Sequence, residues 1–208
     1  MSQAKCEDPS SSYHLQRNED QEEKCSVIEK TDTNTTEAQI VKHPLQHTWT
    51  LWYFENDRSR KWEENQREVI DFNTVEDFWC LFNHIKPAGE LKNSSDYSLF
   101  KKGIRPMWED DANKNGGRWL INIDKPTRDE INLCWLELVL CMIGEAFDEA
   151  SDEICGAVVS IRAKAAKLGL WTGNANNEKP QLMCRNWLFG LSATVKLGKN
   201  WFPCCRGN

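Results

Sequence analysis

The sequence predicts an α+β fold, a single domain in which a few helices accompany an antiparallel sheet. Several segments dense in aromatic and β-branched residues, such as TWTLWYF at 48–54, are typical of strands. Two segments, which begin at Thr74 and Thr127, combine a capping residue with helical spacing of apolar side chains. Strands that form hairpins and alternate with a few helices favour an antiparallel sheet, so these observations together indicate the α+β class.

The chain is expected to begin with a disordered polar tail, residues 1–42. This stretch is rich in Ser, Thr, Asn, Gln and Glu and has few large apolar residues. Such a segment cannot bury enough surface to offset the entropy that it would lose on ordering. The folded domain is expected over residues 43–208, because a chain of 208 residues suits one domain and a tail.

The first half of the domain predicts two strands and a helix. After the strand at 48–54 and a polar loop, residues 68–72 are a weaker strand candidate. Thr74 is the expected N-cap of a helix that runs to Ile85, with Asp77 in its first turn. The proline and glycine of the following PAG sequence are expected to end this helix.

The second half predicts four strands around the longest helix. The strands are expected at 98–100, 118–123, 154–161 and 167–171, and the last two form a hairpin across a short basic link. The helix begins with TRDE, in which Thr127 and a glutamate three residues later fit a capping box. Its apolar run is nearly continuous to residue 143, which predicts burial on more than one side.

Charge and composition exclude several classes of protein. The net charge is −6, so the chain is not a general polyanion binder, and any nucleic-acid contact needs a local basic patch. No stretch approaches the ~20 apolar residues of a membrane span, and the polar N-terminus lacks the apolar core of a signal peptide. We therefore expect no membrane association and a cytoplasmic location, to which a nuclear location could be added.

The cysteines and the motifs argue against a metal site and against catalysis. The nine cysteines contain no C-x-x-C pair, and Cys80, Cys134, Cys141 and Cys155 are expected to be reduced apolar fillers in helices and strands. The chain has no phosphate-binding P-loop, no G-x-S-x-G and no H-E-x-x-H. We therefore expect no enzymatic activity, no metal and no cofactor.

Tryptophan is unusually frequent, with ten copies. Three of them, Trp62, Trp108 and Trp171, stand in loops or at strand ends, where an aromatic face can serve as a stacking platform. A cationic base held between two such faces gains a cation–π term in addition to stacking. For any single tryptophan, packing in the core explains its presence equally well.

Two charged segments could complement such a platform. The acidic run Glu109–Asp111 follows Trp108 and could accept hydrogen bonds from a base edge, although a solvated turn explains it as well. Arg162, Lys164 and Lys167 share one predicted hairpin and would suit a chain of phosphates. An ordinary basic surface turn is the alternative interpretation of these three cations.

Five segments together resemble the eukaryotic translation initiation factor 4E family, over about residues 43–173. They are HPLQHTWTLWYF, TVEDFWCLFNHI, DYSLFKKGIRPMWEDD, GGRWLINI and CWLELVLCMIGEAFDEASDEICGAVVSIRAKAAKLGLWT. The resemblance implies a curved antiparallel sheet backed by helices. It also implies that the concave face binds the 7-methylguanosine cap of mRNA.

The resemblance assigns roles to individual residues of the cap site. Trp62 and Trp108 would sandwich the 7-methylguanine ring, Glu109 would accept hydrogen bonds from its N1 and N2 edge, and Trp171 would pack on the N7 methyl group. The phosphates would be contacted by basic residues, namely Arg162 and Lys167 with support from Arg118 and Lys164. Since N7 methylation makes the ring cationic, stacking and the carboxylate would both favour the methylated base.

The resemblance also implies a second binding surface on the opposite, dorsal face. It would take a short helix with a Tyr-x-x-x-x-Leu-apolar motif, from the 4G scaffold or from 4E-binding repressors, in the helix-in-groove mode. The corresponding residues are His43, Pro44, Val75, Trp79, Leu136, Glu137 and Leu140. Without the resemblance, Val75 and Trp79 would be interpreted as core. A monomer is expected, because both surfaces serve ligands.

From about Asn174 the sequence departs from the family. Leu182, Met183, Trp187 and Leu188 could form a short helical stripe, and residues 192–197 could form a strand. Three functions remain open. The chain could be a cap-binding initiation factor, or a diverged isoform that regulates or represses translation. It could also be a cap hydrolase, for which only the Glu109–Asp111 run offers metal-binding carboxylates.

Overall fold

The structure is a computed structural model, which describes residues 41–178, 182, 184 and 197–203. The predicted disordered tail, residues 1–42, therefore lies outside the described residues except for its last two. Of the predicted C-terminal helical stripe only Leu182 is described, and it is helical. The strand predicted at 192–197 also lies outside the described residues, except for Leu197, at which a strand begins.

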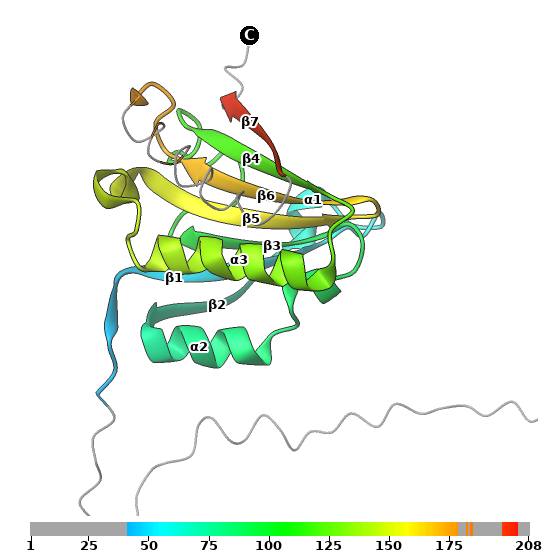
Figure 1. The fold of residues 1–208 in the computed structure, drawn as a ribbon, viewed down its shortest axis with the longest axis horizontal. Coiled ribbons are helices and arrows are strands. Elements are labelled where there is room, and N and C mark those ends of the chain that lie inside the picture. Colours follow the sequence, from blue (N-terminus) through cyan, green and yellow to red (C-terminus); the bar gives the residue numbers. More distant parts are fainter. Residues whose placement is uncertain (1–40, 179–181, 183, 185–196, 204–208) are drawn as a thin grey trace, which may run out of the picture. The chain divides into compact units, whose positions relative to one another are not determined.

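The described residues form an α+β unit around an antiparallel sheet of seven strands, in the order β2-β1-β3-β5-β6-β4-β7. Figure 1 shows this sheet curving across the unit, with the two longer helices on one of its faces. The sequence prediction of an α+β fold on an antiparallel sheet is therefore confirmed. The strands are β1 (Pro44–Glu55), β2 (Gln66–Thr74), β3 (Ser95–Lys101), β4 (Gly117–Asp124), β5 (Ile154–Arg162), β6 (Ala165–Thr172) and β7 (Leu197–Pro203).

Both predicted helix starts are confirmed. Helix α2 (Val75–His84) begins after Thr74, whose hydroxyl accepts a hydrogen bond from the Asp77 backbone N–H at 3.1 Å. Helix α3 (Arg128–Ile143) begins with a complete capping box. The Glu130 N–H donates to the Thr127 hydroxyl at 3.2 Å, and the Thr127 N–H donates to the Glu130 carboxylate at 2.7 Å. These caps satisfy backbone groups that would otherwise lack partners, and they are local enough to predict from sequence.

Three short helical segments were not predicted. They are α1 (Trp62–Asn65), η2 (Ala88–Glu90) and η3 (Asp148–Glu153). No side chain of the N-cap residue caps any of them, and each is too short to establish a helical apolar period. Their positions therefore depend on the strands that they connect. Of the three, α1 matters most for the binding site, because it carries Trp62, which the sequence predicted to lie in or beside a loop.

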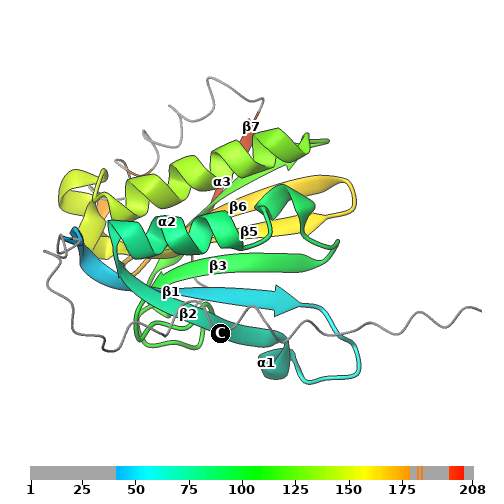
Figure 2. The same cartoon turned by 90° about the horizontal axis from the view of Figure 1, so that it is seen from below.

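The core lies between the sheet and the helices. Side chains of the central strands, such as Leu99, Ala157 and Leu168, pack with Trp135 and Leu138 from α3 in one apolar cluster. Figure 2 shows α2 and α3 next to each other on this face of the sheet. The opposite face of the sheet is therefore available for a binding site.

The prediction that α3 is buried on more than one side is wrong. Its buried residues follow a single helical stripe: Ile131, Cys134, Trp135, Leu138, Val139, Met142 and Ile143. Leu133 and Leu140 lie outside that stripe and are 48% and 36% exposed. The sheet covers one side of the helix only, and the continuous apolar run therefore contains a second, accessible face.

The cysteines in the described part of the chain are free thiols. Cys134, Cys155 and Cys184 are buried, Cys141 is partly buried and Cys80 is exposed on α2, so only Cys80 departs from the expected filler role. Burial raises the pKa of Cys155 and of Cys184 to about 12. No described helix has the length and apolar character needed to cross a membrane.

Candidate functional site

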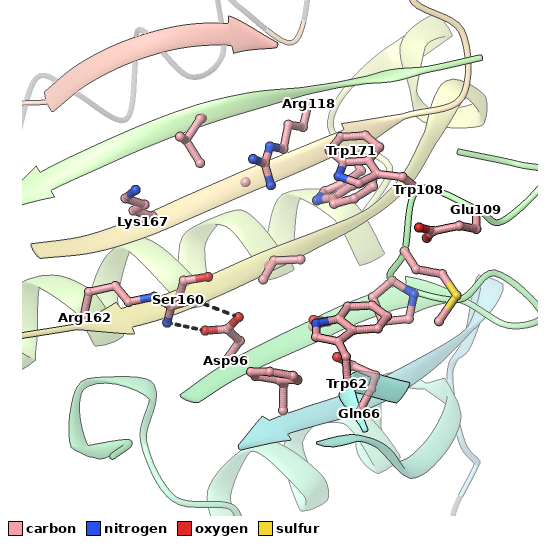
Figure 3. Close-up of a pocket in the computed structure, with 17 residues that line it drawn as sticks. Trp62, Gln66, Asp96, Trp108, Glu109, Arg118, Ser160, Arg162, Lys167 and Trp171 are labelled. Atoms are coloured by element: carbon pink, nitrogen blue, oxygen red, sulfur yellow. Dashed lines mark hydrogen bonds and ion pairs between the residues drawn. The ribbon is translucent and has the colours of Figure 1, made fainter. Parts of the chain in front are cut away.

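The main candidate site is a pocket of about 470 Å³ on the sheet face that the helices leave open (Figure 3). Side chains alternate between the two faces of a strand, so one residue in two reaches this pocket. On β5, for example, Val158 and Ser160 line the pocket, whereas Ala157 and Val159 lie in the core. Together with Trp62 on α1 and the loop before β4, strands β1 to β6 supply the walls, with β2 contributing Gln66.

The aromatic end of the pocket brings together the three tryptophans predicted from the sequence. Trp62 is 49% exposed and lies beside Phe54, with ring centroids 6.4 Å apart. Trp108 stacks on Trp171, with centroids 3.7 Å apart and an interplanar angle of 30°. The resemblance implied Trp62 and Trp108 as the facing pair, whereas Trp108 here lies on Trp171, which is only 4% exposed.

Arg118 covers the stacked pair. Its guanidinium carbon lies 5.2 Å from the centroid of the Trp108 ring and 5.9 Å from that of the Trp171 ring. Such a distance allows a cation–π interaction with both rings. The aromatic end of the pocket therefore already contacts one positively charged group, the Arg118 guanidinium. The 7-methylguanine ring implied by the resemblance is also positively charged.

The loop that carries Trp108 and Glu109 is held by a buried amide. Asn113 is fully buried, and its side-chain nitrogen donates hydrogen bonds to the carbonyls of Arg105 and Met107, at 2.9 and 2.8 Å. The Glu109 side chain is exposed and its carboxylate points toward the pocket (Figure 3). Sequence reasoning missed Asn113, although Asn and Asp in a polar run are typical of side chains that bond to nearby backbone.

The opposite end of the pocket is basic. Arg162 from β5 and Lys167 from β6 both line it, and the Arg162 guanidinium pairs with the Asp96 carboxylate at 2.6 and 3.3 Å. The register places Asp96 opposite Ser160, and Ser160 opposite Lys167, in a row across β3, β5 and β6. Sequence reasoning also missed Asp96, because the partners in this row are distant in the chain.

The chain is similar to a known protein family over most of its length. The family model described as "Eukaryotic initiation factor 4E" matches residues 44–195. The chain belongs to this family. The match extends beyond Thr172, where the last of the five resembling segments ends.

Individual members of the 4E family are similar over most of their length. The chain is 48% identical to eukaryotic translation initiation factor 4E1 of Drosophila melanogaster over 200 residues, which cover 92% of this chain and 76% of that protein. It is 51% identical to eukaryotic translation initiation factor 4E of Homo sapiens over 155 residues, or 73% and 71% of the two chains.

Solved structures of 4E proteins share the fold. C. elegans eIF4E-3, in complex with the 4E-binding protein Mextli and a cap analog, is 45% identical, with a TM-score of 0.72 over 77% of this chain and 92% of that chain. Ascaris suum eIF4E-3 with an m7G cap is 42% identical, with a TM-score of 0.73 over 80% and 94% of the two chains.

The structure places seven of the eight predicted cap residues of this 4E-family chain around the one pocket. They are Trp62, Trp108, Glu109, Arg118, Arg162, Lys167 and Trp171. Lys164 lies elsewhere, in the turn between β5 and β6, where it lines a separate hollow. The turn lies beyond the last paired residues of the two strands, Arg162 and Ala165, so Lys164 does not belong to the sheet face that lines the pocket. No group of three or more His, Cys, Asp or Glu that could hold a metal occurs among the residues described.

The predicted dorsal surface of the 4E fold is exposed on α2 and α3. Val75 and Trp79 are 36% and 38% exposed, so they are not core residues, and Leu140 is equally accessible. Leu136 and Glu137 are partly buried beside it. Leu133 was missed, although its spacing from Leu136 and Leu140 is the helical spacing of a second apolar stripe.

Contacts at the start of α2 hold the first residues of this surface. The His43 backbone N–H donates to the Glu76 carboxylate at 2.9 Å, and the His43 ring nitrogen lies 2.6 Å from the same carboxylate. The Val75 N–H donates to the His43 carbonyl at 2.9 Å. These contacts place His43 and Pro44 next to the helix that carries Val75 and Trp79.

Proposed function

We propose that this chain binds the 7-methylguanosine 5′ cap of mRNA in the pocket and recruits the 4G scaffold for translation initiation. The observation that carries the proposal is the order of groups along one pocket: three tryptophans and the Glu109 carboxylate at one end, Arg162 and Lys167 at the other. A cationic base joined to a chain of phosphates has the complementary order. The solved 4E structures of C. elegans and Ascaris suum contain a cap analog and an m7G cap, which supports the proposal.

Recognition of the base rests on its positive charge. A ring that carries a positive charge gains from an aromatic face and from a nearby carboxylate, and Glu109 can accept hydrogen bonds from the guanine N1 and N2 edge. Unmethylated guanine lacks the positive charge and loses the cation–π contribution. The pocket should therefore discriminate by methylation and not by RNA sequence.

The sandwich requires Trp108 to leave Trp171 and to face Trp62. This movement gives up an aromatic pair contributing about 1 kcal/mol beyond its buried area, together with the Arg118 contact. A base stacked on aromatic rings contributes about 1–3 kcal/mol per base, and a desolvated cation–π contact about 2 kcal/mol. The exchange is favourable, and it uncovers Trp171 for the N7 methyl group.

The phosphates would bind at the basic end. Asp96 holds the Arg162 guanidinium in a two-point contact and so limits its rotamers before any phosphate arrives. Lys167 makes no ion pair within the described part of the chain and is free to contact a phosphate oxygen. One oriented cation and one unpaired cation suit a chain of several charged oxygens.

Recruitment of partners would use the dorsal surface. Val75 and Trp79 on α2 and Leu136 and Leu140 on α3 provide apolar contacts for a helix with a Tyr-x-x-x-x-Leu-apolar motif. Solved 4E proteins occur in complexes with Mextli and with a 4E-BP. The scaffold and the repressors would compete for this one surface.

Fluorescence titration with 7-methyl-GTP and with GTP tests cap binding. We expect 7-methyl-GTP to quench tryptophan fluorescence and GTP to bind far more weakly, and Trp62→Ala to lose about tenfold or more in affinity for 7-methyl-GTP. Trp79→Ala removes a tryptophan from the opposite face and serves as the control, with unchanged affinity. Equal binding of the two nucleotides, or none with a cooperatively melting protein, would contradict the proposal.

A further inference from the structure

A second hollow, of about 630 Å³, lies at the end of the sheet beyond the basic end of the pocket. We call it the basic hollow. Figure 1 shows that the β5–β6 turn and the start of α3 lie at this same end. The residues that line it are Gly89, Lys125, Pro126, Arg128, Ile131, Ile161, Arg162, Ala163, Lys164 and Ala165.

Three cations of the basic hollow have no carboxylate partner within the described ranges: Lys125, Arg128 and Lys164. By contrast, Lys42, Lys92, Lys102 and Lys114 each pair with a carboxylate at 2.5–2.8 Å. The nearby Glu130 turns back to the Thr127 N–H and hydroxyl at 2.7 and 3.0 Å in the capping box. None of these three cations is therefore held in an ion pair with a carboxylate of the described residues, and each is free to contact a ligand.

The backbone holds these cations in place. The Lys125 N–H donates to the Lys164 carbonyl at 3.2 Å, which joins the β4–α3 connection to the β5–β6 turn. Lys125 itself has a positive φ of 50°, a conformation that such a hydrogen-bonded turn supports. A Cβ on Gly89 would lie 2.4 Å from the Arg128 carbonyl oxygen, so η2 can rest on the first turn of α3 only with glycine at this position.

Arg162 connects this hollow to the pocket, because it lines both. In the proposed cap complex, the base lies at the tryptophan end and the phosphates extend toward Arg162 and Lys167. The nucleotides that follow the cap would therefore leave the pocket at this end of the sheet. The unpaired cations lie where the next phosphates would pass.

We propose that the basic hollow binds the phosphodiester backbone of the first nucleotides after the cap. The inference rests on the proposed cap binding, since the cap sets the direction of the RNA. Continuity with the phosphate end of the pocket favours RNA over an acidic peptide. No aromatic side chain lines the hollow, so the contacts are to phosphates, independent of base sequence and sensitive to salt.

The test compares 7-methyl-GTP with a capped RNA of ten nucleotides, using a variant that carries Lys125→Ala, Arg128→Ala and Lys164→Ala. We expect its Kd for 7-methyl-GTP to stay within about twofold. Its Kd for the capped RNA should rise about fivefold to tenfold, because three exposed ion pairs each contribute a factor of about two. The salt dependence for the capped RNA should also become shallower, by about 0.7 in log–log slope for each phosphate that the variant no longer neutralises.

The matched control carries Arg58→Ala, Arg67→Ala and Lys86→Ala. It removes the same number of exposed cations that have no ion pair in the described residues, and it should leave both affinities unchanged. An equal loss in both variants, or an unchanged salt slope, would overturn the inference while leaving cap binding intact. Tight binding of a poly-glutamate peptide that depends on the three cations, with capped RNA unaffected, would also overturn it. If 7-methyl-GTP fails to bind the wild-type chain, the proposed function fails, and this inference fails with it.

Discussion

At the scale of single residues, two polar side chains position the groups that would contact the cap. Asn113 ties together the loop that carries Trp108 and Glu109, and Asp96 fixes the guanidinium of Arg162. Neither would touch the base in the proposed complex. Both act by limiting the positions that a contacting side chain can adopt, so their loss should weaken binding without removing a contact.

Replacement of Asn113 by alanine should loosen the Trp108 loop. The change leaves the carbonyls of Arg105 and Met107 without their donor, and a buried unsatisfied group costs about 1–3 kcal/mol. We expect a lower urea midpoint and weaker binding of 7-methyl-GTP. Asn115→Ala, an exposed change in the same loop, is the control, and equal effects of the two changes would argue against a special role for Asn113.

Replacement of Glu109 by glutamine should reduce discrimination between 7-methyl-GTP and GTP. The change keeps the size of the side chain and removes the negative charge that complements the methylated base, and a hydrogen bond to a charged group contributes about 1.5–3 kcal/mol. Titration of both nucleotides measures the ratio of their Kd values. Asp111→Asn removes a neighbouring charge, which pairs with Lys114, and should leave that ratio unchanged.

At the scale of elements, α2 and α3 each serve two purposes. One stripe of α3 closes the core, while Leu133 and Leu140 are exposed on its outer side and Leu136 is partly buried beside them. On α2, Phe78 is buried and its neighbour Trp79 is exposed, with the two rings 5.0 Å apart. A helix packed on one side only can present a second apolar face to a partner.

Trp79→Ala should abolish binding of a peptide with the Tyr-x-x-x-x-Leu-apolar motif and leave 7-methyl-GTP binding intact. Truncation of a central tryptophan in an interface costs about 2 kcal/mol or more, which is about a thirtyfold loss of affinity. Calorimetry with a peptide from the 4G scaffold measures it, and Cys80→Ala on the same helix is the control. Retention of peptide affinity in the Trp79 variant would place the partner elsewhere.

At the scale of the whole molecule, ion pairs between distant segments link folding to pH. Lys102 from the end of β3 pairs with Asp71 of β2 at 2.7 Å, and Thr50 of β1 donates a hydrogen bond to the same carboxylate at 2.6 Å. The hydrogen bond from Lys102, followed by that from Thr50, lowers the pKa of Asp71 from its ordinary value. The charged form of Asp71 is therefore favoured in the folded state.

Asp71→Asn should destabilise the protein near neutral pH and have less effect in acid. Because the folded pKa of Asp71 is lowered, its contribution is complete above the ordinary carboxyl pKa of about 4 and disappears as the pH falls through the lowered value. Urea unfolding of wild type and variant at pH 7, 5 and 3 measures the difference in free energy. A difference that grows toward acid would contradict this assignment. Asp111→Asn offers a control at an exposed pair within one loop.

Much of the fold was predictable because its signals are local. The caps at Thr74 and Thr127 lie within three residues of their partners, and the strand β1 contains its own aromatic and β-branched pattern. Trp62, Trp108 and Trp171 were identified by their places beside loops and at strand ends. The family resemblance added the grouping of these residues with Glu109, and that grouping agrees with the walls of the pocket.

Contacts between distant segments decided the rest. The pairing of Trp108 with Trp171, the contact of Asp96 with Arg162 and the location of Lys164 outside the pocket each depend on strand register and on loop conformation. By itself, the sequence determined the fold class and the helix starts, because caps and periodicity act over a few residues, and it marked three tryptophans as a possible stacking platform; the assignment of a cap site came from the family resemblance. Only the tertiary structure decided which ring covers which and which cations share a hollow, because residues as far apart in sequence as Lys125 and Lys164, or Asp96 and Arg162, become neighbours only after the sheet has formed.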